Sequence, residues 1–144
     1  MKRSETIKRD TAFMKTCMRT ALELSSGRFT PSAEVIVSAS IRKPAPSYFV
    51  TMDNAMRKLR EIINRGVSSS ERITARKRMW FEILGKVRER NGISPDGIIS
   101  TRILTQVLYR SRPSSFFISK DYALRLYYSI NSSHRKRHAN FLIH

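Results

Sequence analysis

The sequence predicts a mainly α-helical protein built as a tandem duplication of two three-helix units, and three observations lead to this prediction. Apolar residues recur at helical spacing in several segments. The stretch PSYFVTMDNAMRKLREII, from Pro46, has a second version, SSFFISKDYALRLYYSI, from Ser114. Each version follows two segments with helical patterning. These features define two units, residues 1–68 and 69–133, and a basic C-terminal tail at 134–144.

The duplication rests on a single alignment offset. A shift of 68 residues brings six identical pairs into coincidence: Ser47/Ser115, Phe49/Phe117, Asp53/Asp121, Ala55/Ala123, Arg57/Arg125 and Ile62/Ile130. The same shift places SAEVIVSASIR, from Ser32, onto STRILTQVLYR, from Ser100. Because one offset serves both segments, we predict an internal repeat with the order helix, turn, helix, aromatic segment, helix.

The first helix of each unit carries an apolar stripe at helical spacing. It is expected within residues 5–25, closed by Gly27, and within residues 71–91, closed by Gly92, because glycine commonly follows a helix end. The stripes are Ile7, Met14, Cys17, Met18 and Ala21 in the first unit and Ile73, Trp80, Ile83, Leu84 and Val87 in the second. Both stripes predict buried side chains, the single cysteine and the single tryptophan included.

The second helix of each unit is marked at both ends. A start signal follows each glycine, TPSA at Thr30 and SPDG at Ser94, with proline expected at the first helical position. Pro44 and Pro46 end the helix in the first unit, and Pro113 ends it in the second. Proline has this effect because it disfavours a helical conformation of the residue before it.

A short aromatic segment, SYFVT or SFFIS, precedes each third helix. Its β-branched and aromatic content predicts a short extended strand. The aromatic pairs are Tyr48-Phe49 and Phe116-Phe117. Either both rings of a pair pack between helices, or one ring is exposed and stacks on bases, since neighbours in an extended chain point to opposite faces.

The third helix of each unit combines a core face with a basic face. Thr51 and Ser119 are the predicted N-caps. The core faces are Ala55, Leu59 and Ile62 in the first unit and Ala123, Tyr127 and Ile130 in the second. Arg57 and Arg125 point away from these faces at 100° per residue. The units are therefore helix-turn-helix or winged-helix-like, although the connection KPAPSYFVT is long for a standard turn.

The block PAPSYFVT, from Pro44 to Thr51, is followed by a basic helix. This combination resembles one that recurs in small basic bacterial proteins, including proteins carried by phages or mobile elements. The resemblance covers only this block and the start of the helix, and it implies no function. It favours a phage or mobile-element context for the chain.

Basic residues outnumber acidic residues by 28 to 11, which gives a formal net charge of +17. Nineteen of the 28 are arginine, whose planar fork matches phosphate bidentately. With few carboxylates to pair with these cations, we expect a surface that binds a polyanion. The candidate nucleic-acid-binding residues are Arg42, Lys43, Arg57, Lys58, Arg60, Arg76, Lys77, Arg78, Arg110, Arg112, Arg125, Arg135, Lys136 and Arg137.

Motifs for catalysis, metals and cofactors are incomplete in this sequence. Gly92 and Gly97 have the spacing of a phosphate-binding loop, but the next two positions are isoleucines rather than Lys and Ser/Thr. His134 and His138 have helical spacing, but the three cations between them would repel a metal ion. We therefore expect no enzyme activity, no metal and no cofactor.

The single cysteine, Cys17, excludes an intramolecular disulfide and suits a reducing compartment. No stretch approaches the apolar length of a membrane span. The basic N-terminal segment is interrupted by charges where a signal peptide needs an apolar core. We expect a cytoplasmic protein without a membrane partner.

Two classes of function follow from these features. The first is a non-enzymatic nucleic-acid-binding protein, with DNA favoured over RNA, that uses its third helices and the tail at 134–144. The helix residues assigned to this role are Arg57, Lys58, Arg60 and Arg125. The alternative is a structural or interaction protein of a large assembly, such as a phage particle or a ribosome. Sequence specificity and oligomeric state stay open at this stage.

Overall fold

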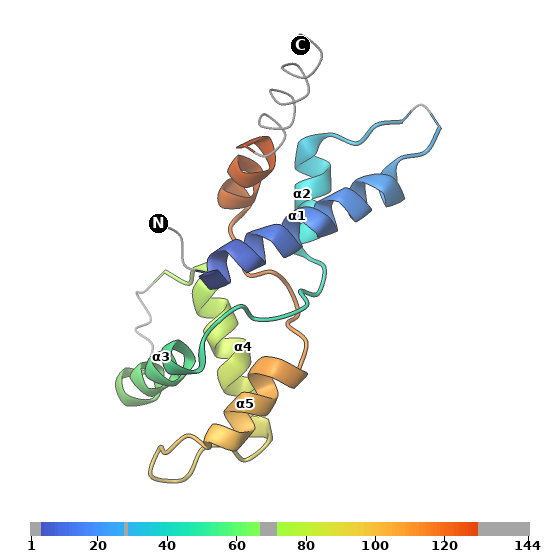
Figure 1. Cartoon of the computed structure of the whole chain (residues 1–144). Helices are drawn as coiled ribbons and strands as arrows, with labels where there is room; N and C mark the ends of the chain where they lie inside the picture. Colours follow the sequence, from blue (N-terminus) through green and yellow to red (C-terminus); the bar gives the residue numbers. More distant parts are fainter. Residues whose placement is uncertain (1–3, 28, 67–71, 130–144) are drawn as a thin grey trace.

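The computed structural model of the chain describes residues 4–27, 29–66 and 72–129, and these are mainly α-helical (Figure 1). The helices are α1 (Ser4–Leu24), α2 (Ala33–Ile41), α3 (Met52–Arg65), α4 (Ala75–Glu89) and α5 (Thr101–Arg110). A further helical segment covers residues 120–129. The prediction of a mainly α protein is thus confirmed. None of the helices in the described residues is long and apolar enough to cross a lipid bilayer.

Hydroxyl side chains start five of the helical segments. In each case the Oγ atom accepts a hydrogen bond from the backbone N–H three residues later, which satisfies a free donor of the first turn. The capping residues and distances are Ser32 at 3.3 Å, Thr51 at 3.2 Å, Thr74 at 3.2 Å, Ser100 at 3.3 Å and Ser119 at 3.1 Å. The predicted caps Thr51 and Ser119 are confirmed.

Both predicted starts of the second helices are displaced. Helix α2 begins at Ala33 after the cap Ser32, so Pro31 precedes the cap instead of occupying the first helical position. In the second half, Ser94 begins a turn rather than a helix, because its Oγ atom accepts the N–H of Ile98 at 3.0 Å and its carbonyl accepts that of Gly97 at 2.9 Å. Helix α5 therefore begins at Thr101.

Gly92 follows α4 where a glycine was predicted, and close packing requires it there. Its N–H donates to the Val87 carbonyl at 2.8 Å. A Cβ atom at this position would lie 2.6 Å from Val87 Cγ1 and 2.7 Å from Ile103 Cγ2, closer than carbon atoms can approach. The glycine thus allows α5 to pack against the end of α4.

The apolar stripes predicted for the first helices are partly wrong. Ile7 and Met18 on α1, and Ile73 ahead of α4, are each more than half exposed. The buried face of α1 is centred on Phe13 and Cys17 instead, which turns Met18 toward solvent. The predicted burial of Cys17 is confirmed, as is that of Trp80, which is 3% exposed.

The two aromatic segments are not strands. The described residues contain only isolated β-bridges, and neither segment takes part in one. Phe49 has φ 55° and Phe117 has φ 53°, so a left-handed residue interrupts the extended chain in both segments. In each segment the N–H of this phenylalanine donates to the serine Oγ two residues earlier, Ser47 at 3.1 Å and Ser115 at 3.2 Å. The two segments therefore share one local conformation.

One ring of each aromatic pair lies in the core. Tyr48 and Phe116 are each 3% exposed. Phe116 packs edge-on against Phe13 of α1, with a centroid distance of 5.3 Å. Phe49 and Phe117 are half-buried, and Phe117 packs against the core around α4 and α5. These positions favour packing as the role of the rings.

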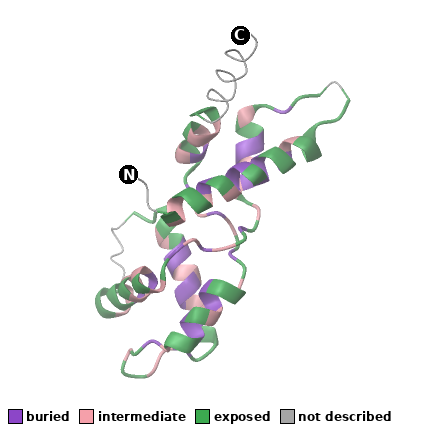
Figure 2. Ribbon diagram, viewed as in Figure 1, coloured by how far each residue is buried: buried purple, intermediate pink, exposed green. Residues whose placement is uncertain are grey.

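The buried residues form two clusters, visible as the purple faces in Figure 2. The α4/α5 cluster contains Tyr48, Val50, Ala55, Leu59, Met79, Trp80, Ile83, Leu84, Val87, Ile99, Ile103, Leu104, Val107 and Leu108. The α1/α2 cluster contains Phe13, Met14, Cys17, Ile36, Val37, Ala45, Phe116, Ile118 and Ala123. Within the described residues, the predicted core positions of both third helices point into these clusters.

Each cluster takes its third helix from the other half of the chain. Helix α3 packs with α4 and α5, and the segment 120–129 packs with α1 and α2. The connections at residues 42–51 and 111–119 run between the clusters in opposite directions (Figure 1). The clusters therefore do not coincide with residues 1–68 and 69–133. Equivalent third helices have equivalent core residues, so the sequence pattern alone does not determine which pair of helices each one joins.

Candidate functional site

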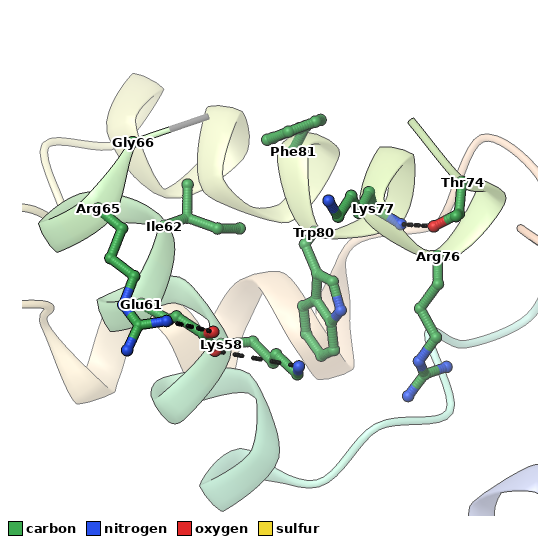
Figure 3. A pocket seen from close by; sticks show the side chains of 10 residues that line it. All are labelled: Lys58, Glu61, Ile62, Arg65, Gly66, Thr74, Arg76, Lys77, Trp80 and Phe81. Carbon is green, nitrogen blue, oxygen red and sulfur yellow. Dashed lines mark hydrogen bonds and ion pairs between the residues drawn. The ribbon is translucent and has the colours of Figure 1, made fainter. Parts of the chain in front are cut away.

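A groove separates the second half of α3 from the first turns of α4 (Figure 3). Its volume is about 500 Å³. The residues that line it are Lys58, Glu61, Ile62, Arg65, Gly66, Thr74, Arg76, Lys77, Trp80 and Phe81. We refer to this cavity as the α3/α4 groove.

Local structure at two helix ends forms the groove. Gly66 has φ 67° and its N–H donates to the Ile62 carbonyl at 2.8 Å, which ends α3. Thr74 starts α4 by accepting the N–H of Lys77. The basic side chains of the last turns of α3 and the first turn of α4 therefore face one space, and Ile62 packs against the cluster that contains Trp80.

The groove is strongly positive. Four cations line it, and Glu61 is the one acidic residue among the described residues of its lining. The Glu61 carboxylate lies 4.0 Å from Lys58 Nζ and 3.7 Å from Arg65 Nη1. Exposed pairs at such distances neutralise little charge. Among the described lining residues, four cations thus stand against one carboxylate, an excess that favours anions.

Apolar side chains form the floor of the groove. Ile62 and Phe81 are half-buried, whereas Trp80 is almost fully buried. The guanidinium carbon of Arg76 lies 5.5 Å from the centre of the Trp80 ring, within cation–π range. Trp80 is thus a core residue and a wall of the groove at once. The arrangement can hold a flat apolar group and an anion together.

The structure brings together three of the predicted binding residues, Lys58, Arg76 and Lys77, in this groove. Arg57 and Arg60 lie on α3 and are exposed, and Arg57 Nη2 donates to Asn54 Oδ1 at 3.0 Å. Both extend the positive surface along α3. Arg78 is exposed on α4 and is not part of the groove lining.

The remaining predicted residues lie elsewhere. Arg42 and Lys43 follow α2, and Lys43 forms an ion pair with Glu23 at 2.7 Å. Arg110 ends α5, and Arg112 follows it. Arg125 is exposed on the segment 120–129, at the opposite end of the molecule from α3 (Figure 1), so it forms no common patch with Arg57. Arg135, Lys136, Arg137, His134 and His138 lie outside the described residues.

Sequence reasoning missed Arg65 and Phe81 in the groove. Arg65 lies seven residues after Lys58, a spacing that places both on one helix face and could have identified it. It also missed a basic stripe on α1, Lys8, Lys15 and Arg19, which lines a second cavity of about 370 Å³. Helical spacing would have shown this stripe too. Phe81 offered no such signal, because its role depends on the approach of α3.

A polar cluster of the buried Tyr48 and the half-buried Glu82 and Lys86 joins α4 to both connections. The Tyr48 hydroxyl donates to Glu82 Oε2 at 2.7 Å and accepts from Lys86 Nζ at 2.6 Å. Glu82 Oε2 also accepts the N–H of Ser114 at 3.2 Å, and Lys86 Nζ donates to the Arg112 carbonyl at 2.9 Å. We call these three side chains the crossover cluster. They fix the point where the two connections pass one another.

Burial and hydrogen bonding shift the pKa values in this cluster. Burial and the bond to Glu82 raise the pKa of Tyr48 far above its ordinary value. Burial alone would raise the pKa of Glu82, but hydrogen bonds from Ser114 and Tyr48 outweigh it and lower the pKa. The cluster therefore holds a neutral phenol beside a carboxylate, an arrangement that stabilises packing. Burial likewise raises the pKa of Cys17, which makes its thiol a weak nucleophile.

Within the part of the chain that the structure describes, no three His, Cys, Asp or Glu side chains lie close enough to hold a metal ion. Comparison with protein-family models, with curated proteins and with solved structures gives no match to this chain.

Proposed function

We propose that this chain is a non-enzymatic nucleic-acid-binding protein, with DNA favoured over RNA. The observation that carries this proposal is the gathering of four cations, two from α3 and two from α4, around one groove in whose described lining Glu61 is the single carboxylate. Phosphate oxygens are the ligands that such a set of Arg and Lys side chains binds best. The net charge of +17 supports the same class of partner.

The proposal includes the duplicated, helix-turn-helix-like architecture. The matching φ angles of Phe49 and Phe117, and the equivalent caps of the helices that follow, support a duplication. Each third helix presents an exposed arginine, Arg57 or Arg125. Two positive surfaces on one chain would raise the affinity for a long nucleic acid through effective concentration, provided that one molecule reaches both. The tail at 134–144 would add sequence-independent affinity.

The salt dependence of binding to a short DNA duplex tests the proposal. Each neutralised phosphate lowers the slope of log K against log salt by about 0.9. We expect affinity to fall steeply and linearly on this plot, measured by fluorescence anisotropy of a labelled duplex. Absence of binding to the duplex and to a single strand of the same length alike, or binding that does not change with salt, would contradict the proposal.

A second candidate is a structural or interaction protein of a large assembly, in a phage or mobile-element context and in the cytoplasm. Exposed apolar side chains favour it: Met18 is 67% exposed and Leu22, one turn further along α1, is 77% exposed. Such side chains can mark a contact with another protein. Co-purification with an assembly, without affinity for free DNA, would support this function and contradict the first.

A further inference from the structure

We infer that the α3/α4 groove holds an unpaired nucleotide, so that this protein binds single-stranded nucleic acid in preference to a duplex. The inference rests on the proposed nucleic-acid function and deepens it by naming the form of the ligand. Three properties of the groove carry it: its volume, its apolar floor and the placement of its cations.

The volume exceeds what a phosphate needs. A cavity of about 500 Å³ falls within the range of roughly 300–1,000 Å³ that is typical of small-molecule sites. A surface that contacted only the phosphate backbone of a duplex would need a row of cations and no cavity of this size. A base with its sugar and phosphate fills a site of this size.

The floor has the chemistry of a base-binding surface. Phe81 and Ile62 project into the space between α3 and α4, and Trp80 forms the wall beside them (Figure 3). Aromatic side chains bind single strands by stacking on the faces of unpaired bases. In a duplex those faces are covered by neighbouring base pairs, so a duplex cannot use this floor.

The cations flank the floor on both sides. Lys58 and Arg65 extend from α3, and Arg76 and Lys77 extend from α4 (Figure 3). A base stacked on Phe81 would thus have Lys77 beside it and the α3 cations across the groove for the neighbouring phosphates, whereas Arg76 lies on the far side of Trp80 (Figure 3). Arg57, exposed on α3, continues the positive surface beyond the groove. This continuity favours a chain of phosphates over an acidic aromatic peptide, which would need further apolar pockets.

Trp80 provides a direct readout, because it is the single tryptophan of the chain and lines the groove. We expect an oligothymidylate to quench its fluorescence, and a duplex of the same length to bind more weakly without this quenching. Phe81→Leu should weaken oligothymidylate binding about tenfold and leave duplex binding unchanged, because an unpaired base can stack on the ring whereas the faces of paired bases are covered. Tyr109→Leu, at a 60% exposed aromatic on α5, is the matched control and should change neither.

A second variant keeps the inference testable if Phe81→Leu fails to fold. Arg65 has a side chain that is 81% exposed, so Arg65→Gln should fold, weaken oligothymidylate binding severalfold and reduce the quenching. Arg102→Gln, which replaces an exposed cation on α5, is its control and should bind oligothymidylate and show quenching of Trp80 as the parent chain does.

Three results would overturn the inference. Equal quenching of Trp80 by duplex and oligothymidylate would show that the groove does not require an unpaired base. Binding of thymidine monophosphate as tightly as the oligonucleotide would assign the groove to free nucleotides. Displacement of the oligonucleotide by an equal concentration of a Glu- and Phe-rich peptide would assign it to a protein partner. Binding of duplex alone would contradict this inference and leave the proposed function standing, whereas absence of binding to either nucleic acid would refute both.

Discussion

The two clusters use the same local pattern but secure their third helices differently. Beside the α4/α5 cluster, the hydroxyl of Tyr48 is held by the Glu82 carboxylate and the Lys86 ammonium group of the crossover cluster. In the α1/α2 cluster the equivalent residue is Phe116, which packs on Phe13 without a hydroxyl. There the polar link involves a buried carboxylate, because the Tyr122 hydroxyl donates to Asp10 Oδ2 at 2.6 Å.

This difference bears on why α3 packs with α4 and α5 and the segment 120–129 packs with α1 and α2. If the third helices changed places, Phe116 would lie beside Glu82 and Lys86, and Tyr122 would lose Asp10. Charged side chains that are removed from water and lose a hydrogen-bond partner destabilise an arrangement by about 1–3 kcal/mol. These polar contacts would favour the observed packing of α3 with α4 and α5, and of the segment 120–129 with α1 and α2.

The largest effect is expected from Phe116→Ala. It removes the ring that packs against Phe13 in the α1/α2 cluster and should lower the free energy of unfolding by about 3–5 kcal/mol. Denaturant unfolding measures this loss. Phe117→Ala, at the half-buried neighbour, is the control and should cost clearly less. Equal losses of unfolding free energy in the two variants would mean that both phenylalanine rings contribute equally to the core.

A smaller effect is expected from Tyr48→Phe in the α4/α5 cluster. The ring stays, but Glu82 and Lys86 lose a shared hydroxyl, so the free energy of unfolding should fall by about 1–3 kcal/mol. Tyr128→Phe, at a 57% exposed tyrosine, should have no measurable effect. An unchanged stability of Tyr48→Phe would mean that the hydroxyl does not secure the connection.

The pH dependence of stability distinguishes the clusters further. The pKa of Glu82 is lowered in the folded chain from its ordinary value of 4.5. Its contribution to stability is therefore present above that value and is lost as pH falls through the folded pKa. Unfolding curves recorded between neutral and acidic pH should show this loss, and Glu82→Gln should flatten it. A parallel pH dependence in the parent chain and the variant would rule Glu82 out as its source.

Helix content and the starts of the third helices could be predicted from the sequence because they depend on local residues, whereas both predicted starts of the second helices were displaced. Thr51 and Ser119 cap the helices that follow them, as their hydroxyl chemistry predicts. The packing of α3 with α4 and α5 could not be predicted, because it involves contacts between residues far apart in the sequence, such as Tyr48 and Glu82, 34 residues further along the chain. The aromatic segments resembled strands, but Phe49 and Phe117 adopt positive φ where a serine Oγ binds their N–H groups.

Part of the candidate site could also be predicted from local residues. Basic clusters identified Lys58, Arg76 and Lys77, since charge can be read residue by residue. Their convergence with Phe81 depends on how the end of α3 meets the start of α4. The sequence pattern could not separate these converging cations from Arg125, which is exposed on the segment 120–129.

The most direct test of the central claim is removal of charge from the α3/α4 groove. Lys58→Gln combined with Arg76→Gln takes one cation from each wall, and Arg88→Gln combined with Arg102→Gln removes two exposed cations elsewhere. The slope of log K against log salt for a single-stranded oligonucleotide should become shallower by about 1.4 in the groove variant, or 0.7 for each lost contact. The control variant should keep the parent slope. Identical slopes for both variants would contradict the assignment of nucleic-acid binding to this groove.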